Sequence, residues 1–114
     1  MIQIKNWRTG AVIFEGEYQS IKDAVEAAVK QGVSLAWANL AYEDFTDAIL
    51  IGAILTRANL IGANLIGADL TDAILIGANL TWADLTRAIL IRAILYGADL
   101  TDAIVTGTIL DTKK

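Results

Sequence analysis

A five-residue period over residues 33–112 constrains the fold of this chain more than any other feature. Every fifth residue from Leu35 to Leu110 belongs to one column, in which 14 of the 16 repeats have Leu and the exceptions are Phe45 and Val105. Two positions before it, 13 of 16 residues are Ala. The residue between them is Asn, Asp or Ile in every repeat except the first, which has Ser34. Sixteen tandem copies of one short unit indicate a repeat architecture rather than a conventional globular core.

A solenoid is the architecture that buries this pattern. On an α-helix each residue advances by about 100°, so positions five apart scatter around the axis and form no apolar stripe. On a continuous strand, a step of five places successive Leu residues on opposite faces. The pattern fits when Ala and Leu point inward from a short extended segment and the next two residues turn a corner. Each repeat is then one side of a coil, and its apolar side chains are buried when coils stack.

Composition excludes most classes of enzyme. The chain has no Cys and no His, so it has no thiolate or imidazole for nucleophilic catalysis, general-base catalysis or zinc binding. Ser20 and Ser34 are the only serines, and neither standard glycine-rich phosphate loop is present. We therefore expect a protein that is not an enzyme, with no catalytic residue, no metal site and no cofactor.

Hydrophobic residues make up 55% of the chain, a share that would suit a membrane protein. A membrane-spanning helix, however, needs about 20 consecutive apolar residues. The longest stretch without a charged residue, 31–42, has 12 residues and contains Gln, Ser and Asn. Lys5 and Arg8 interrupt any apolar signal segment at the N-terminus. We therefore expect no membrane contact and a cytoplasmic location.

The repeats resemble those of the pentapeptide-repeat family, whose unit is A-[D/N]-L-x-x. Residues 58–62 and 63–67 both read ANLIG, and residues 68–72 read ADLTD. The resemblance covers residues 33–112 and implies a mainly β fold, a right-handed quadrilateral β-helix with four pentapeptides in each coil. The 16 repeats would then make about four coils. Some members of the family mimic DNA to bind DNA gyrase and are dimers joined at the C-terminal end of the solenoid.

The first 32 residues do not repeat and predict a cap on the solenoid. Alternating apolar residues on either side of the turn-forming segment 6–10 indicate a β-hairpin. Ser20 and Asp23 then resemble a capping box, an apolar helix face follows over residues 21–29, and Gly32 suits a left-handed helix end. We therefore divide the chain into a hairpin and helix cap at 1–32, the β-helix at 33–112 and a tail at 113–114.

The outward positions separate into faces when repeats are assigned cyclically to four sides. One face reads Asn39, Asn59, Asn79 and Asp99, where stacked amides suit hydrogen bonding up the column. Nine of the 12 outward Ile residues fall on two adjoining faces, although β-propensity alone also favours Ile in a strand. Contiguous apolar surface favours an interface. The candidate interface residues are Ile49, Ile51, Ile54, Ile74, Ile76, Ile89, Ile91, Ile94, Tyr96, Ile109 and Leu110.

Some residues depart from the repeat. Glu43 occupies an inward Ala position, and we expect its carboxylate to reach solvent or a Lys or Arg side chain, because an unpaired buried charge is costly. Trp37 and Tyr42, at corners of the first coil, are expected to pack under the cap. Trp82, at a corner of a later coil, is expected to be exposed and to suit an interface.

These features lead to two hypotheses of function. The first is a structural or protein-interaction module that forms a homo-oligomer, a dimer being favoured, through the Ile faces or the open C-terminal coil. The second, which follows from the family resemblance, is a DNA-mimicking modulator of DNA gyrase, a type II topoisomerase. A net charge of −4 and the absence of a basic stripe disfavour direct nucleic-acid binding.

Overall fold

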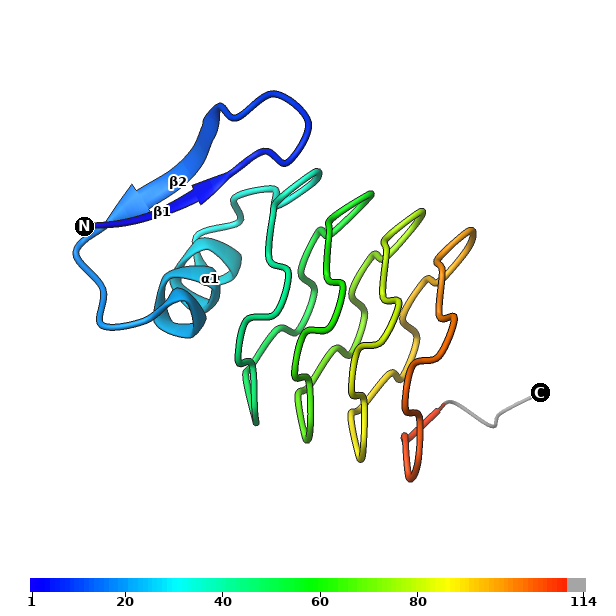
Figure 1. The fold of residues 1–114 in the computed structure, drawn as a ribbon. Helices are drawn as coiled ribbons and strands as arrows, with labels where there is room; N and C mark the ends of the chain where they lie inside the picture. The colour runs from blue at the N-terminus through cyan, green and yellow to red at the C-terminus, as the bar shows by residue number, and fades with distance from the viewer. Residues whose placement is uncertain (111–114) are drawn as a thin grey trace.

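In the computed structural model, which describes residues 1–110, a hairpin and one helix precede a stack of coils (Figure 1). Strand β1 (Ile2–Lys5) pairs antiparallel with β2 (Val12–Gly16), and helix α1 (Ile21–Lys30) follows. No helix among the described residues combines the length and the hydrophobicity that a membrane span requires. Residues 111–112 of the predicted repeat region and the predicted tail, 113–114, lie outside the described residues.

The predicted hairpin and helix are confirmed. In the turn between the strands, the side-chain oxygen of Asn6 accepts hydrogen bonds from the backbone N–H groups of Arg8 and Thr9. The hydroxyl oxygen of Ser20 accepts from the Asp23 N–H at 3.1 Å, which satisfies a donor that the first helical turn leaves free. At the other end, Gly32 has a φ of +74°, the left-handed conformation that often ends a helix.

The repeats form coils in which residues 20 apart in sequence lie side by side. Parallel bridges join Asn39 to Asn59, Asp44 to Asn64, and so on up to Ile89 and Ile109, as expected from the assignment of columns. Apart from Ser34, the residue before Leu on each side of a coil is bridged, so the coils within residues 33–110 contain isolated bridges and no long strands. Longer strands do not form because a corner interrupts the extended chain every five residues.

Each corner is a tight turn with a left-handed residue. The N–H of the Ala that begins a repeat donates to the carbonyl of the preceding Leu, as Ala58 does to Leu55 at 3.0 Å. The residue just before that Ala has a positive φ at every corner from Trp37 to Gly107. A positive φ at this position of a turn favours Gly. Nine of these positions nevertheless hold other residues, among them Trp82 with a φ of +67°.

Replacing Trp82 by Gly should therefore stabilise the fold. A left-handed conformation costs a residue with a side chain about 1–2 kcal/mol, whereas Gly loses only about 0.5–1 kcal/mol more chain entropy on folding. The Trp82 side chain is 66% exposed and makes no hydrogen bond or ring contact among residues 1–110, so little packing is lost. We expect a gain of about 0.5–1 kcal/mol in the free energy of unfolding, measured by urea denaturation. Trp82→Ala, which keeps the strain, should show no such gain.

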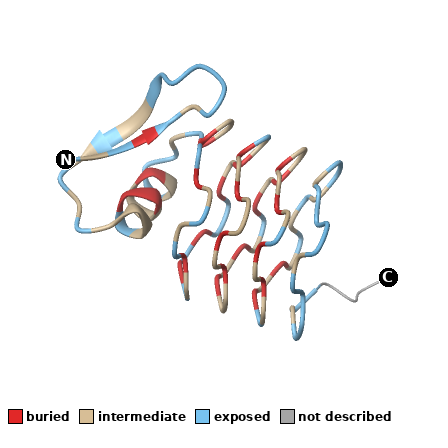
Figure 2. Ribbon diagram, in the orientation of Figure 1, coloured by how far each residue is buried: buried red, intermediate tan, exposed pale blue. Residues whose placement is uncertain are grey.

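The inward Ala and Leu columns form the core, as the period predicted. Every inward residue from Leu35 to Leu90 except Glu43 is buried, and Ile4 joins this core from β1 together with Ala24, Val25 and Ala28 from α1. Figure 2 shows this as a continuous series of buried positions that ends before the last coil. Glu43 is half-buried, and neither ion pair of the described residues involves its carboxylate.

The N-terminal elements contact the first coil through hydrogen bonds. The carbonyl of Lys5 in β1 accepts from the Asn39 N–H at 2.8 Å, in the way that the Ala38 carbonyl accepts from Asn59 one coil later. From α1, Lys22 Nζ donates to the Thr46 carbonyl at 2.6 Å. Glu26 Oε2 accepts from the Ile49 N–H at 2.7 Å. Side chains and backbone of the cap thus satisfy backbone groups that have no coil beneath them.

Candidate functional site

The exposure of the predicted interface residues varies with their height in the stack. The exposed residues lie at its two ends, in the first coil (Ile49 and Ile51) and in the last coil (Ile94, Tyr96, Ile109 and Leu110). The other five are half-buried because neighbouring coils cover part of each side chain (Ile54, Ile74, Ile76, Ile89 and Ile91). The two Ile faces therefore do not form a uniformly exposed apolar surface.

The largest cluster of exposed apolar residues lies in the last coil, 93–110, which we call the open coil. In one inward column the exposed fraction of the Leu residue rises from 0% at Leu70 to 7% at Leu90 and 54% at Leu110. The open coil also exposes three residues that the sequence reasoning missed, Leu100, Ile104 and Val105. Their position in the final repeats was the available signal, because no further coil among residues 1–110 covers them.

The open coil has a hollow apolar end and backbone groups without a partner among residues 1–110. A cavity of about 190 Å³ opens there, lined by Leu residues of the upper two coils together with Val105 and Thr108. The N–H groups of Leu100 and Val105 have no acceptor among residues 1–110. In the coil below, the corresponding N–H of Leu85 donates to the Ile104 carbonyl at 2.7 Å. An apolar surface bordered by free backbone donors is a template for association with another chain.

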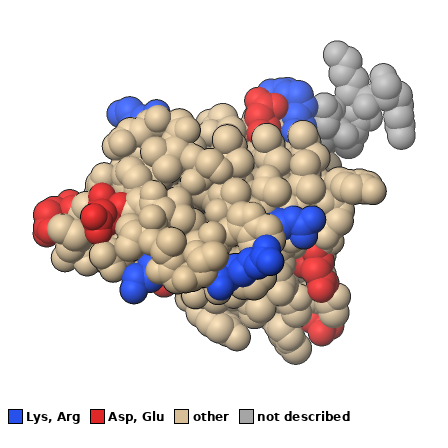
Figure 3. Space-filling model, turned by 90° about the horizontal axis from the view of Figure 1, so that it is seen from above, with Lys and Arg blue, Asp and Glu red and all other residues tan. Residues whose placement is uncertain are grey.

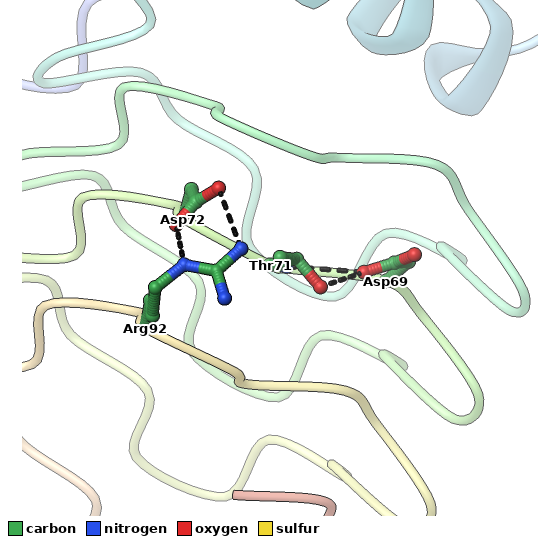
Figure 4. A network of polar contacts seen from close by, with 4 residues as sticks. All are labelled: Asp69, Thr71, Asp72 and Arg92. Carbon is green, nitrogen blue, oxygen red and sulfur yellow. Dashed lines mark hydrogen bonds and ion pairs between the residues drawn. The ribbon is translucent and has the colours of Figure 1, made fainter. Parts of the chain in front are cut away.

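The polar side chains before Leu stabilise the corners. The Oδ1 atom of Asn59 accepts from the Ile61 N–H at 3.1 Å, and seven other Asn and Asp residues make the same contact two residues on (Asn39, Asp44, Asn64, Asp69, Asn79, Asp84 and Asp99). Where Thr follows Leu, its hydroxyl donates to the same oxygen, as in Asp69 and Thr71 (Figure 4). These bonds run within each turn, whereas the sequence had suggested bonds up the column.

Three carboxyl groups have a lowered pKa. The Thr46 hydroxyl beside Asp44 and the Thr101 hydroxyl beside Asp99 lower the pKa of each carboxyl below its ordinary value by donating hydrogen bonds to the ionised form. The pKa of Asp72 is lowered chiefly by Arg92, which reaches back from the next coil (Figure 4). Arg92 Nε lies 2.7 Å from Asp72 Oδ1.

These shifts predict a loss of stability in acid. A carboxyl whose pKa is lower in the folded state stabilises the fold above its unfolded value, 3.8, and loses that contribution as the pH falls through the folded value. We therefore expect the urea midpoint to decline below about pH 4. Asp72→Asn should make this decline shallower because it removes one of the three groups. A midpoint that rises between pH 4 and pH 2 would contradict the assignment.

The aromatic residues at the corners behave differently from one another. Trp37 packs against Trp7 of the hairpin turn, with 5.4 Å between ring centroids, and Arg57 lies over its ring. The expectation that Tyr42 packs under the cap is wrong, because its side chain is 77% exposed. Its ring instead leans over Gly62 in the next coil, where the absence of a side chain leaves room. Trp82 is exposed, as expected.

The charged and polar side chains of residues 1–110 are spread over the surface of the stack. Among residues 1–110, no group of acidic side chains could hold a metal ion. A hollow of about 420 Å³ lies between Trp7, Arg57 and the Asn59–Asn79 column, but its one carboxylate, Asp99, is held by Thr101 in its own turn. The face in Figure 3 is largely uncharged, and the acidic and basic side chains lie mostly in small groups around its edges. The open coil is therefore the site that best supports a functional role.

Comparisons with known proteins agree with this architecture. The family model for pentapeptide repeats matches eight copies over residues 31–65, 53–90 and 73–111. The chain is 32% identical to alr5209, a pentapeptide repeat protein from Nostoc, with a TM-score of 0.63, and the match covers 79% of this chain and 85% of that one. Comparison with curated proteins gave no match.

A second solved structure has a higher sequence identity to this chain, but the match covers a smaller part of that protein. The chain is 40% identical to Rfr23, a pentapeptide repeat protein from the cyanobacterium Cyanothece 51142, with a TM-score of 0.47. That match covers 69% of this chain and 57% of Rfr23, so the chain spans little more than half of that protein. From the period of its repeats, the stacked coils and the family match over most of its length, we conclude that this chain belongs to the pentapeptide-repeat family.

Proposed function

We propose that this chain is a non-enzymatic protein-interaction module that associates with a second copy of itself through the open coil. The observation that supports this most directly is the exposure of inward residues there, because Leu100, Val105 and Leu110 occupy core positions of the repeat and yet contact solvent. Burying such side chains against another chain stabilises a complex by about 25 cal/mol for each Å² of apolar surface removed from water. The N–H groups of Leu100 and Val105, which have no acceptor among residues 1–110, add directional contacts.

The lateral Ile faces are the weaker alternative. Ile74, Ile89 and Ile91 are already half-covered by their neighbours, so pairing of these faces would bury little additional surface for each residue. Ile49 and Ile51 are more exposed, but they lie beside α1, far from the exposed Ile residues of the open coil. We also propose that the 16 repeats make four coils of a right-handed quadrilateral β-helix, the form that the 20-residue spacing of the bridges supports.

A pair of charge substitutions in the open coil tests this proposal. Val105→Lys with Leu110→Lys places two charges on the apolar end without filling the buried core, so the β-helix should still form. By light scattering, we expect the unaltered chain to have twice its chain mass of 12.2 kDa and the double variant to have the chain mass itself. The matched control, Ile49→Lys with Ile51→Lys, adds the same charge to a lateral face and should remain a dimer.

The opposite result for these two variants would overturn the assignment. If the Ile49 and Ile51 variant became monomeric while the open-coil variant stayed dimeric, the association would be lateral. A single-chain mass for the unaltered protein at all accessible concentrations would contradict self-association itself. Circular dichroism of every variant would establish that the β-helix is retained.

The second hypothesis, modulation of DNA gyrase by DNA mimicry, remains a prediction. A mimic needs a continuous acidic column, and the column of Asp44 and Asp84 is interrupted by Asn64 and ends at Ile104. A gyrase supercoiling assay with added protein tests it directly. Inhibition or protection of the enzyme near equimolar protein would favour mimicry, and no effect at large excess would count against it.

A further inference from the structure

The two ends of the stack differ in how their backbone hydrogen bonds are satisfied. Between coils, the N–H of the residue after Ala donates to the Ala carbonyl of the coil below, as Asn59 does to Ala38 at 2.8 Å and Asp69 to Ala48 at 2.9 Å. At the first coil, the same two columns find their acceptors in the cap, Lys5 and Glu26. At the open coil, the corresponding carbonyls of Ala98 and Thr108 have no donor among residues 1–110.

The open-coil carbonyls without a donor among residues 1–110 are suitable acceptors for the first-coil N–H groups that the cap binds. The Ala98 carbonyl belongs to the column that would meet the Asn39 N–H of a second copy stacked in line. The Thr108 carbonyl belongs to the column that would meet the Ile49 N–H. Because every coil repeats the same 20-residue register, a first coil without its cap would continue the ladder of the open coil.

Contact between the open coil of one copy and the first coil of the next could be repeated without limit. An interface that joins two different surfaces of one chain adds copies without closing and generates fibres, whereas an interface that joins one surface to itself stops at two. In this chain the cap occupies the groups that a second copy would need. The Lys5 carbonyl in β1 accepts from the Asn39 N–H at 2.8 Å. From α1, Glu26 Oε2 accepts from the Ile49 N–H at 2.7 Å and Lys22 Nζ donates to the Thr46 carbonyl at 2.6 Å.

We infer that the first coil of this chain is a concealed docking surface for the open coil of a second copy, and that α1, together with β1, closes it and limits assembly to a dimer. This inference rests on the proposed function, since it takes the open coil as the associating surface. The assembly of the intact protein then joins open coil to open coil. When the cap is released, the open coil instead binds the first coil of another copy, and further copies add in line.

A charge-neutral exchange, Lys22→Glu with Glu26→Lys, tests the inference. It places an acceptor against the Thr46 carbonyl and a donor against the Ile49 N–H, so both contacts become repulsive while the buried face of α1 (Ala24, Val25 and Ala28) is unchanged. By sedimentation velocity, we expect the exchange variant to lose the fixed dimer mass and to show a mass that rises continuously with concentration. Electron microscopy should show unbranched filaments.

The controls separate this inference from the proposed function. Adding Val105→Lys and Leu110→Lys to the exchange variant removes the other partner surface, so growth should be lost. Growth that persists in this variant would mean unspecific aggregation and would overturn the inference. An exchange variant that keeps native circular dichroism and remains a dimer would also overturn it, while leaving the proposed function intact.

Two remaining outcomes are also decisive. A monomeric unaltered protein together with a filament-forming exchange variant would reject the proposed dimer and support the concealed surface. If the exchange variant loses its circular dichroism signal, the single change Glu26→Lys, which disturbs one hydrogen bond, replaces it. A dimer of fixed mass in that folded variant would reject the inference, and growth with concentration would support it.

Discussion

Replacing Leu70 by Ala should lower the free energy of unfolding by about 2–5 kcal/mol. Leu70 is completely buried in the middle of the stack, with Leu50 below it and Leu90 above it in the same column. Removing its side chain leaves a cavity that the surrounding coils cannot fill, because the ladder hydrogen bonds on both sides hold the backbone at a fixed spacing. Urea denaturation monitored by circular dichroism measures the loss.

Leu110→Ala is the matched control, since it makes the same change in the same column. Leu110 is 54% exposed, so its substitution should cost less than about 1 kcal/mol in the dissociated chain. Both variants should be measured at low protein concentration, because association stabilises the folded state by mass action. Equal losses for the two variants would contradict the difference in burial between the middle and the end of the stack.

Val25→Asp should destabilise the protein by about 3–5 kcal/mol, the usual cost of an unpaired buried charge. Val25 is completely buried in the face of α1 that packs against the rest of the core. A carboxylate there has no cationic partner, so it must either remain uncompensated or separate α1 from the first coil. We expect a lower urea midpoint together with increased dye binding to exposed apolar surface.

Ala27→Asp provides the comparison for this variant. Ala27 lies on the same helix but is only half-buried, so its substitution loses more helix propensity than Val25→Asp does, without full burial of the charge. It should cost less than about 1.5 kcal/mol. If both variants lost the same stability, the effect would come from the helix itself, and the packing of Val25 against the core would not be its cause.

The local elements were predictable because their signals lie within a few residues of sequence. Ser20 and Gly32 mark the ends of α1 through contacts made inside the helix or next to it. The five-residue period likewise identifies the inward columns, because an extended segment of three residues always directs its first and third side chains to one side. The corner hydrogen bonds of Asn59 and Asp69 were equally local, and the pattern of Asn or Asp before Leu could have identified them.

The candidate site was less accessible to sequence reasoning because burial depends on which coils are adjacent. Ile74 and Ile94 share a column and a residue type, yet Ile74 is half-buried whereas Ile94 is exposed in the last coil. The hydrogen bonds from Lys22 and Glu26 to the first coil join residues more than 20 positions apart. No periodicity in the sequence indicates which side chains of the cap reach an unpaired backbone group.

The sequence by itself determined that this chain is a solenoid with Ala and Leu inside, because a period of five leaves no other way to bury those residues. It also determined that catalysis by Cys or His is absent. The tertiary structure decided which of the repeated residues are covered. Identical repeats have identical local preferences, so only the stacking order distinguishes Leu70 in the core from Leu110 at the open end. That difference in stacking leaves apolar side chains exposed at one end of a uniform repeat.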